Sequence, residues 1–189
     1  MKRPWIVVAV VAVVVVLVIG LTQLGSSTTT NKRAPGLTAA QRQLTGSPPA
    51  LDALHRDANR LLPGKDRKAR LAALRGHPIV LNAWGSWCAP CRAEFPLLQR
   101  VSERVGKRVA FVGLDVQDPA ADAAKFLRSH PVTYPSYQDI NRALSSGYGL
   151  IGTPSTIFYD ARGKQTFLHS GPYTKDAQLL ADIRRYAGA

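Results

Sequence analysis

The feature that most limits the folds open to this chain is a short apolar run that ends close to a pair of cysteines. The run Ile79 to Trp84 is typical of a strand that is buried in a parallel sheet. From Cys91 to Gly106 the apolar residues recur with helical spacing, at Phe95, Leu98, Val101 and Val105. The sequence therefore predicts an α/β fold with a Cys88-x-x-Cys91 motif at a strand-to-helix turn.

This placement gives the two cysteines different chemical roles. Unpaired backbone N–H groups and the positive end of the helix dipole favour a thiolate at Cys88, so we expect Cys88 to be the nucleophile. Cys91 lies one helical turn further on, faces the same side and is placed to resolve a mixed disulfide. Pro90 fits the first helical turn, where its missing N–H costs nothing.

The cysteine count excludes several classes of protein. Two cysteines cannot build a multi-bridge disulfide scaffold or a cysteine-rich zinc module, and no histidine lies within ten residues of the pair, so we predict no metal site. The alternative to a redox role is an inert disulfide. A bridge this short removes little entropy from the unfolded chain, so stability alone explains it poorly.

The N-terminal segment has the pattern of a membrane anchor. Lys2 and Arg3 precede the apolar run Ile6 to Leu21, which flanking residues extend to 5–24. Twenty helical residues span roughly 30 Å, the thickness of a bilayer's hydrocarbon core. We expect an uncleaved single-pass anchor in a bacterial cell membrane, with the following residues extracytoplasmic; a cleavable signal peptide is the alternative.

Four regions follow from composition and periodicity. Residues 1–24 are the anchor, residues 25–50 are predicted as a flexible stem, residues 51–75 as two short amphipathic helices broken at Pro63-Gly64, and residues 76–189 as the catalytic domain.

The net charge of +13 is unevenly distributed along the chain. Residues 31–75 carry ten basic and three acidic groups, whereas residues 76–189 carry thirteen basic and nine acidic groups. A basic face on the catalytic domain is therefore not indicated, and we expect no nucleic-acid partner. The basic membrane-proximal residues are expected to form a solvated helix face, with anionic headgroups as an alternative contact.

The stretch Trp87 to Pro96 resembles the active site of the membrane-anchored, TlpA/ResA/DsbE-like thioredoxin-fold proteins. The resemblance covers roughly residues 75–189. It implies a thioredoxin-like α/β fold, a central mixed β-sheet flanked by helices, attached to the N-terminal transmembrane anchor. It also implies a role for Glu94 in the protonation of the cysteines, because Asn82 stands where thioredoxins themselves carry a buried aspartate.

The resemblance implies a substrate-binding region beside the cysteines. In a thioredoxin fold the proline that enters the strand opposite the cysteines is cis, and here the candidate is Pro154. Its cis bond exposes the Thr153 backbone, which in relatives pairs with an extended substrate peptide. Trp87 and Pro90, next to the two cysteines, complete the predicted substrate contacts; Trp87 is also expected to shield the nucleophile.

Downstream of the motif, the remaining elements follow in the order expected for this fold. The sequence predicts strands at 108–116, 132–139 and 155–159, a hairpin partner at 165–170, a helix capped by Asp118, and a last helix that opens at Thr174.

These features predict an extracytoplasmic thiol-disulfide oxidoreductase whose only redox group is the Cys88–Cys91 couple, without a further cofactor. The resemblance implies that it reduces exported protein disulfides, including the Cys-x-x-Cys-His site of apocytochrome c, in cytochrome c maturation. A membrane thiol carrier would supply the electrons, and we expect a monomer.

Two alternatives remain open from the sequence. The same couple, run in reverse, makes a disulfide-forming oxidase of exported proteins. A non-catalytic tethered binding module is the alternative from another class, although it would not need both cysteines. A peroxidase is less well supported, since no Pro-x-x-x-Thr-x-x-Cys pattern leads to Cys88.

Overall fold

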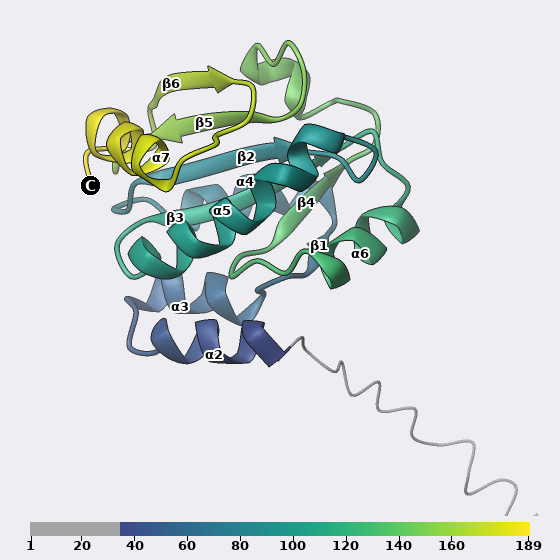
Figure 1. Ribbon diagram of the computed structural model, residues 1–189. Helices are drawn as coiled ribbons and strands as arrows, with labels where there is room; N and C mark the ends of the chain where they lie inside the picture. The colour runs from purple at the N-terminus through teal and green to yellow at the C-terminus, as the bar shows by residue number, and fades with distance from the viewer. Residues whose placement is uncertain (1–34) are drawn as a thin grey trace, which may run out of the picture. The chain divides into compact units, whose positions relative to one another are not determined.

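A six-stranded mixed sheet forms the centre of the fold in the computed structural model, which describes residues 35–189 (Figure 1). The strand order is β1-β4-β3-β2-β5-β6. The first four strands of that order run parallel, β5 pairs antiparallel with β2, and β6 pairs antiparallel with β5 at the edge of the sheet. The strands are β1 (Leu61–Leu62), β2 (Ile79–Trp84), β3 (Ala110–Val116), β4 (Ser136–Asp139), β5 (Ser155–Tyr159) and β6 (Gln165–Ser170).

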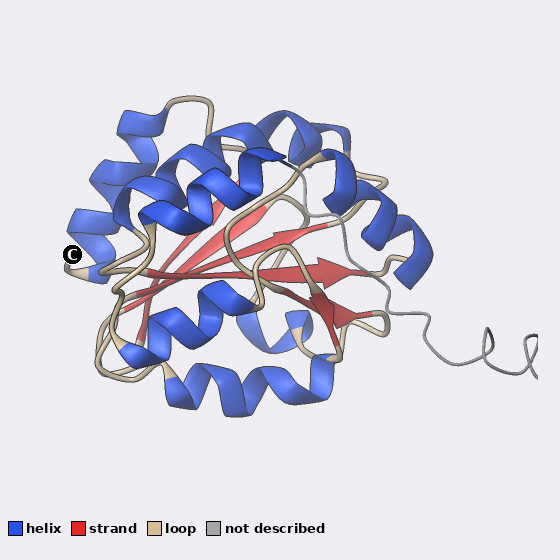
Figure 2. Cartoon of the chain, turned by 90° about the horizontal axis from the view of Figure 1, so that it is seen from below, coloured by secondary structure: helices blue, strands red, loops and turns tan. Residues whose placement is uncertain are grey.

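Helices cover both faces of this sheet (Figure 2). The helices are α2 (Pro35–Gln43), α3 (Pro49–Arg56), α4 (Arg67–Ala73), α5 (Ala89–Val105), α6 (Ala120–Ser129) and α7 (Asp176–Asp182), with short turns at Gly64–Asp66, Ser145–Tyr148 and Ile183–Ala187. Residues of α5, α6 and α7 form one hydrophobic core with one face of the sheet. Residues of α3 and the end of α4 form a second core on the opposite face.

The two central strands are buried along their whole length, because both faces of the sheet are covered. In β2, side chains alternate between the two cores: Val80 and Trp84 belong to the α5 side, and Leu81 and Ala83 to the α3 side. The predicted strand Ile79–Trp84 is therefore confirmed. Trp84 is fully buried and packs edge-on against Phe95 of α5 at a ring-centroid distance of 5.1 Å.

The downstream strands are confirmed with shorter boundaries. The strand predicted at 108–116 begins at Ala110, and the one predicted at 132–139 contains only Ser136–Asp139. Pro135 lacks the N–H that a ladder needs, and the Val132 amide donates instead to the Asn59 side chain at 3.1 Å. The hairpin of β5 and β6 is confirmed, and the last helix begins at Asp176, two residues later than predicted.

The predicted flexible stem is wrong for its C-terminal part. Pro35–Gln43 form α2, and its apolar residues Leu37 and Ala40 are buried, as is Leu44 just beyond it. The Gln41 side-chain amide also donates to the His55 carbonyl oxygen at 3.0 Å. The polar composition of this segment hid three apolar residues at i, i+3 and i+7, which suffice for one buried helical face.

The membrane-proximal region 51–75 has the two predicted helices, with a strand between them. Pro49–Arg56 and Arg67–Ala73 are helical, and β1 joins the edge of the sheet beside β4. Gly64 follows β1 at a point where a Cβ atom would collide with the Gln138 carbonyl oxygen, so the break at Pro63-Gly64 lets the chain pass close to β4.

The predicted anchor, residues 1–24, lies outside the described residues. Between positions 35 and 189, no helix combines the length and the apolar composition that a membrane span requires.

Candidate active site

The cysteine motif lies at the carboxyl end of β2, where the chain turns into α5. The Cys88 amide donates to the Gly85 carbonyl oxygen at 3.1 Å and closes this turn. Cys88 is the N-cap of α5, and its Sγ accepts a hydrogen bond from the Cys91 amide at 3.2 Å. The helix therefore presents an N–H donor to the sulfur of Cys88, as the sequence predicted for a nucleophile at this position.

Cys88 and Cys91 form a disulfide with a Cα–Cα distance of 5.3 Å. Cys88 is 3% exposed and Cys91 is fully buried. The neighbouring residues Ala89 and Pro90 are exposed. A partner molecule therefore meets Pro90 and the rim of Cys88 before it meets Cys91, which fits an outer attacking and an inner resolving cysteine.

The peptide bond between Thr153 and Pro154 is cis, as predicted. The antiparallel register pairs Ala83 with Ser155, so Pro154 lies level with the end of β2, from which the cysteine turn starts. Pro154 is buried and Thr153 is partly exposed. The two segments predicted to meet the substrate, around Cys88 and around Pro154, therefore lie at the same end of the sheet.

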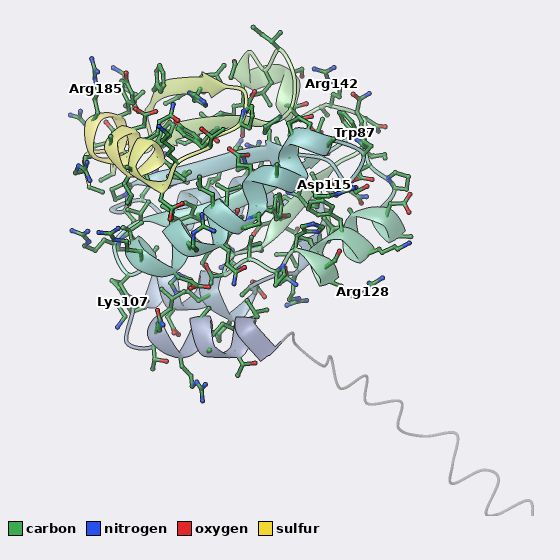
Figure 3. The ribbon with its side chains drawn as sticks, viewed as in Figure 1. Trp87, Lys107, Asp115, Arg128, Arg142 and Arg185 are labelled. Carbon is green, nitrogen blue, oxygen red and sulfur yellow. A yellow bond between two sulfur atoms is a disulfide. The ribbon has the colours of Figure 1, made fainter. Side chains whose placement is uncertain are left out.

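A pocket joins Trp87 to the segment before Pro154. It is lined by Trp87, Val116, Gln117, Arg142, Ser145, Leu150, Gly152 and Thr153. Trp87 is 58% exposed and Ile151, next to the lining, is 88% exposed. Figure 3 shows Trp87 and Arg142 at the same end of the sheet. This pocket and its edge thus offer large apolar side chains and the cationic side chain of Arg142.

The indole of Trp87 lies across the turn that precedes Cys88. Its Nε1 donates to the Val116 carbonyl oxygen at 3.2 Å. A Cβ atom on Gly85 would lie 2.6 Å from the same Nε1, so the absence of a side chain at Gly85 is what lets the ring occupy this position. One face of the turn is therefore formed by an aromatic ring that is largely open to solvent.

Glu94 is buried inside α5, one helical turn beyond Cys91, and is only 1% exposed. Its Oε1 accepts from the Tyr173 amide at 2.9 Å, and its Oε2 accepts from Asn82 Nδ2 at 3.2 Å. Burial raises the pKa of Glu94 to about 7, although the bonds from Tyr173 and Asn82 oppose the shift. A carboxyl group with this pKa exchanges a proton readily near neutral pH.

Asn82 occupies the buried position beside Glu94 on β2. Besides Glu94, its Nδ2 contacts Thr156 Oγ1 at 3.4 Å, and its Oδ1 has no hydrogen-bond partner within residues 35–189. Asn82 on β2 and Glu94 on α5 are therefore in direct contact. The Tyr173 amide was not predicted, because nothing local in the sequence links it to a residue 79 positions away.

Asp118 does not cap α6, and this prediction is wrong. The N-cap of α6 is Pro119, without a side-chain hydrogen bond. Instead, the Asp118 carboxylate accepts from the Ser86 Oγ at 2.8 Å and from the Ser86 backbone amide. The backbone amide and the hydroxyl of Ser86 thus bind a carboxylate that the local pattern assigned to the helix.

Within residues 35–189, no cluster of three or more His, Cys, Asp or Glu side chains has the geometry of a metal site.

The sequence profile of the AhpC/TSA family matches residues 56–167, which is more than half of the chain and includes the whole cysteine turn. The chain belongs to the AhpC/TSA family.

Named relatives extend this assignment. Within this family, the chain is 31% identical over 111 residues to the thiol-disulfide oxidoreductase ResA of Geobacillus thermodenitrificans, covering 58% of this chain and 64% of the relative. It is 35% identical over 99 residues to the thiol:disulfide interchange protein DsbE of Pseudomonas fluorescens, covering 52% and 54% respectively. The chain thus spans less than two thirds of the length of either relative.

A solved structure supports the fold. The crystal structure of a secreted Mycobacterium tuberculosis disulfide oxidoreductase homologous to Escherichia coli DsbE superposes with a TM-score of 0.55 at 26% identity, covering 60% of this chain and 85% of the other. The predicted thioredoxin-like α/β fold with a mixed sheet is confirmed by this likeness, and the predicted resemblance to ResA and DsbE is confirmed by the sequence matches.

Proposed function

We propose that this chain is an extracytoplasmic thiol-disulfide oxidoreductase that works through Cys88 and Cys91. The observation that carries the proposal is the disulfide at the N-terminus of α5, at the same end of the sheet as the Thr153–Pro154 segment. The relatives named as thiol-disulfide oxidoreductases and interchange proteins support it. The chemistry needs no cofactor besides the two sulfur atoms.

The reaction proceeds through a mixed disulfide. In the reduced protein, the Cys88 thiolate attacks one sulfur of a substrate disulfide, so that a Cys88–substrate bond forms and one substrate thiolate leaves. Cys91 then attacks the Cys88 sulfur, the intramolecular disulfide forms, and the second substrate thiolate leaves. Two electrons pass from the cysteine pair to the substrate, and the two protons of the cysteines balance the two thiols released.

Glu94 is proposed to accept the proton of Cys91 and to return it. The carboxyl group lies one helical turn beyond Cys91, is buried, and has a pKa near neutrality. As an acceptor it takes the Cys91 proton when this thiol attacks, and as a donor it returns the proton when the pair is reduced again. Asn82 and the Tyr173 amide hold the carboxyl group in place for both steps.

The substrate surface is proposed to be the pocket beside the cysteine turn. An extended polypeptide that pairs with the Thr153 backbone passes Trp87 on one side and Leu150 on the other, since all three line the pocket. Pro90, exposed between the cysteines, contacts the substrate next to its reacting sulfur. The exposed apolar side chains favour an unfolded or flexible protein segment over a small thiol.

Trp87→Ala should lower the activity on protein disulfides much more than the activity on small disulfides. Loss of the ring contact is expected to lower kcat/KM for insulin disulfides about tenfold and to leave the rate with a small aromatic disulfide within about twofold. Trp87→Phe keeps a ring without the N–H and should lie close to the wild type. Equal losses on both substrates would show that Trp87 acts on the cysteines rather than on the polypeptide.

The physiological reaction is proposed to be reduction of exported protein disulfides, with apocytochrome c as a substrate in cytochrome c maturation. The same proposal includes a single-pass anchor at residues 1–24, a membrane thiol carrier as electron donor and a monomeric state. The alternative to this reductase function is that of a disulfide-forming oxidase of exported proteins. A reduction potential near about −270 mV supports the reductant, and one near about −120 mV supports the oxidase.

Turnover of insulin by the full-length wild-type chain in a mild detergent, with dithiothreitol as the electron source, tests the proposed activity. We expect insulin reduction well above the uncatalysed rate. A rate equal to that of the buffer would leave a tethered binding module as the better account of this fold.

A further inference from the structure

Asp115 is a buried acidic residue that the proposed reaction does not use. It lies on β3 next to Trp84 of β2 and is fully buried. Its neighbours Leu114 and Val116 point into the core on the α3 side, so the Asp115 side chain lies on the α5 side of the sheet. Figure 3 shows Asp115 at the end of the sheet that carries Trp87.

The surroundings of the Asp115 carboxyl group are unusual. Neither of its oxygens accepts a hydrogen bond from a donor among residues 35–189. Asp118, three residues further along the chain and also fully buried, is the carboxyl group that acts on it most strongly. Two carboxyl groups can form a hydrogen bond only when one of them carries a proton, because two carboxylates offer four acceptor oxygens and no donor.

Charge and burial indicate which of the two carboxyl groups holds the proton. Asp118 already accepts two hydrogen bonds from Ser86, so both of its oxygens act as acceptors. Burial raises the pKa of Asp115 to about 9, with further contributions from Asp118 and from Asp139 at the end of β4. Asp139 accepts from the amides of Leu144 and Ser145. Within residues 35–189, the charged groups that act on Asp115 are therefore both acidic, Asp118 and Asp139.

The same pair is tied to the cysteine turn. Asp118 binds Ser86 through both of its oxygens, and the Val116 carbonyl oxygen accepts from the Trp87 indole. Three hydrogen bonds thus connect the end of β3 to the two residues that precede Cys88. A group that holds the Asp118 side chain in place therefore also holds the turn at Ser86 and Trp87 in place.

We propose that Asp115 donates a shared proton to Asp118 and that this proton holds the turn carrying Trp87 and Cys88. Asp115 is then a positioning residue for the redox pair, and only this last role rests on the proposed function. With the proton present, the pair carries one negative charge and Asp118 is held against Ser86. Without it, two adjacent carboxylates repel each other and Asp118 turns away from Ser86.

A carboxyl titration of the full-length oxidised protein tests the shared proton directly. The protein is uniformly ¹³C-labelled, and the Asp115 carboxyl signal is assigned by its loss in Asp115→Asn. We expect Asp115 to show the shift of a neutral acid at pH 7 and to titrate near pH 9, with the ¹³C signals of Ser86 and of the Trp87 ring moving at the same midpoint. Titration of Asp115 near pH 4 would overturn the proposal.

Two variants test the link to the turn. Asp115→Asn keeps a donor to Asp118 that does not titrate, so the Ser86 and Trp87 signals should stay constant from pH 7 to pH 10. Asp115→Leu removes the donor, and the Ser86 amide should exchange at least tenfold faster than in the wild type at pH 7, while Asp115→Asn stays within twofold. If Asp115→Leu does not fold, the wild-type and Asp115→Asn titrations still show whether a proton on Asp115 holds the turn in place.

Asp122→Asn is the matched control, because Asp122 is an exposed acid in the first turn of α6. It should leave the transition near pH 9 unchanged. A transition of equal size in Asp115→Asn would overturn the proposal. None of these readings involves turnover, so a wild-type protein that fails to reduce insulin but shows the transition would contradict only the proposed function.

Discussion

Replacement of Cys88 by serine should abolish insulin reduction, with a loss of at least about 10³-fold in kcat/KM. The serine hydroxyl is not ionised at neutral pH, so neither the N-terminal position on α5 nor the Cys91 amide can turn it into a comparable nucleophile. Turnover is measured with the full-length chain, and the fold is checked by its thermal unfolding.

Cys91→Ser is the informative partner of this variant. It should also lose turnover, but it keeps the first half-reaction and should react once, giving one equivalent of mixed disulfide through Cys88. The order of the two roles depends on burial, since Cys91 is fully buried behind the rim of Cys88. A Cys88→Ser protein that forms the adduct, with a Cys91→Ser protein that does not, would reverse the assignment.

Glu94→Gln should flatten the pH dependence of stability. In the folded protein the pKa of Glu94 is raised from 4.5 to about 7, so the folded state holds a proton that the unfolded state releases. The stabilisation from this proton is complete below pH 4.5 and is lost as the pH rises through 7. The wild type should therefore lose about 3 kcal/mol relative to Glu94→Gln between pH 4 and pH 8.

The measurement is urea unfolding of the disulfide form, in which neither cysteine titrates. Glu103, the only other glutamate of the chain, supplies the matched control. It is partly exposed on α5, where Gln99 donates to it at 3.0 Å. Glu103→Gln should parallel the wild type at every pH. Parallel curves for Glu94→Gln and wild type would show that folding does not raise the pKa of Glu94.

The parts of the fold that the sequence predicted well depend on local patterns. The run Ile79–Trp84, the helical spacing after Cys91 and the hairpin of β5 and β6 each lie within one or two elements, and all three are confirmed. The cis bond before Pro154 was predicted from the likeness to a known fold rather than from the residues themselves.

The contacts that the sequence did not predict join segments that are far apart in the chain. The Tyr173 amide reaches Glu94 across 79 positions, and Ser86 reaches Asp118 across 32. The sequence predicted a role beside the cysteines for Glu94 without its partner Tyr173, and it assigned Asp118 to a helix cap. In the folded protein both carboxylates bind donors that are distant in the sequence, because buried carboxylates and buried amides both need hydrogen-bond partners.

The helix α2 shows the same limit for secondary structure. A segment rich in Ser, Thr, Gly and Pro predicts a linker, yet Leu37, Ala40 and Leu44 are buried. The helix depends on docking, since Leu44 lies against Gly106 at the end of α5 and Gln41 bonds to His55. The composition of such a helix reflects mainly its exposed polar face. It does not reveal the few apolar residues that pack against the rest of the domain.

The most direct test of the central claim is to map the disulfide adducts of the full-length Cys91→Ser protein in its native host. Cells are alkylated to block thiol exchange, the protein is purified without reductant, and its linked peptides are identified. The account predicts that the peptide containing Cys88 is joined to cysteine peptides of exported proteins, and that Cys88→Ser/Cys91→Ser yields none. Equal adducts in both proteins, or none through Cys88, would contradict it.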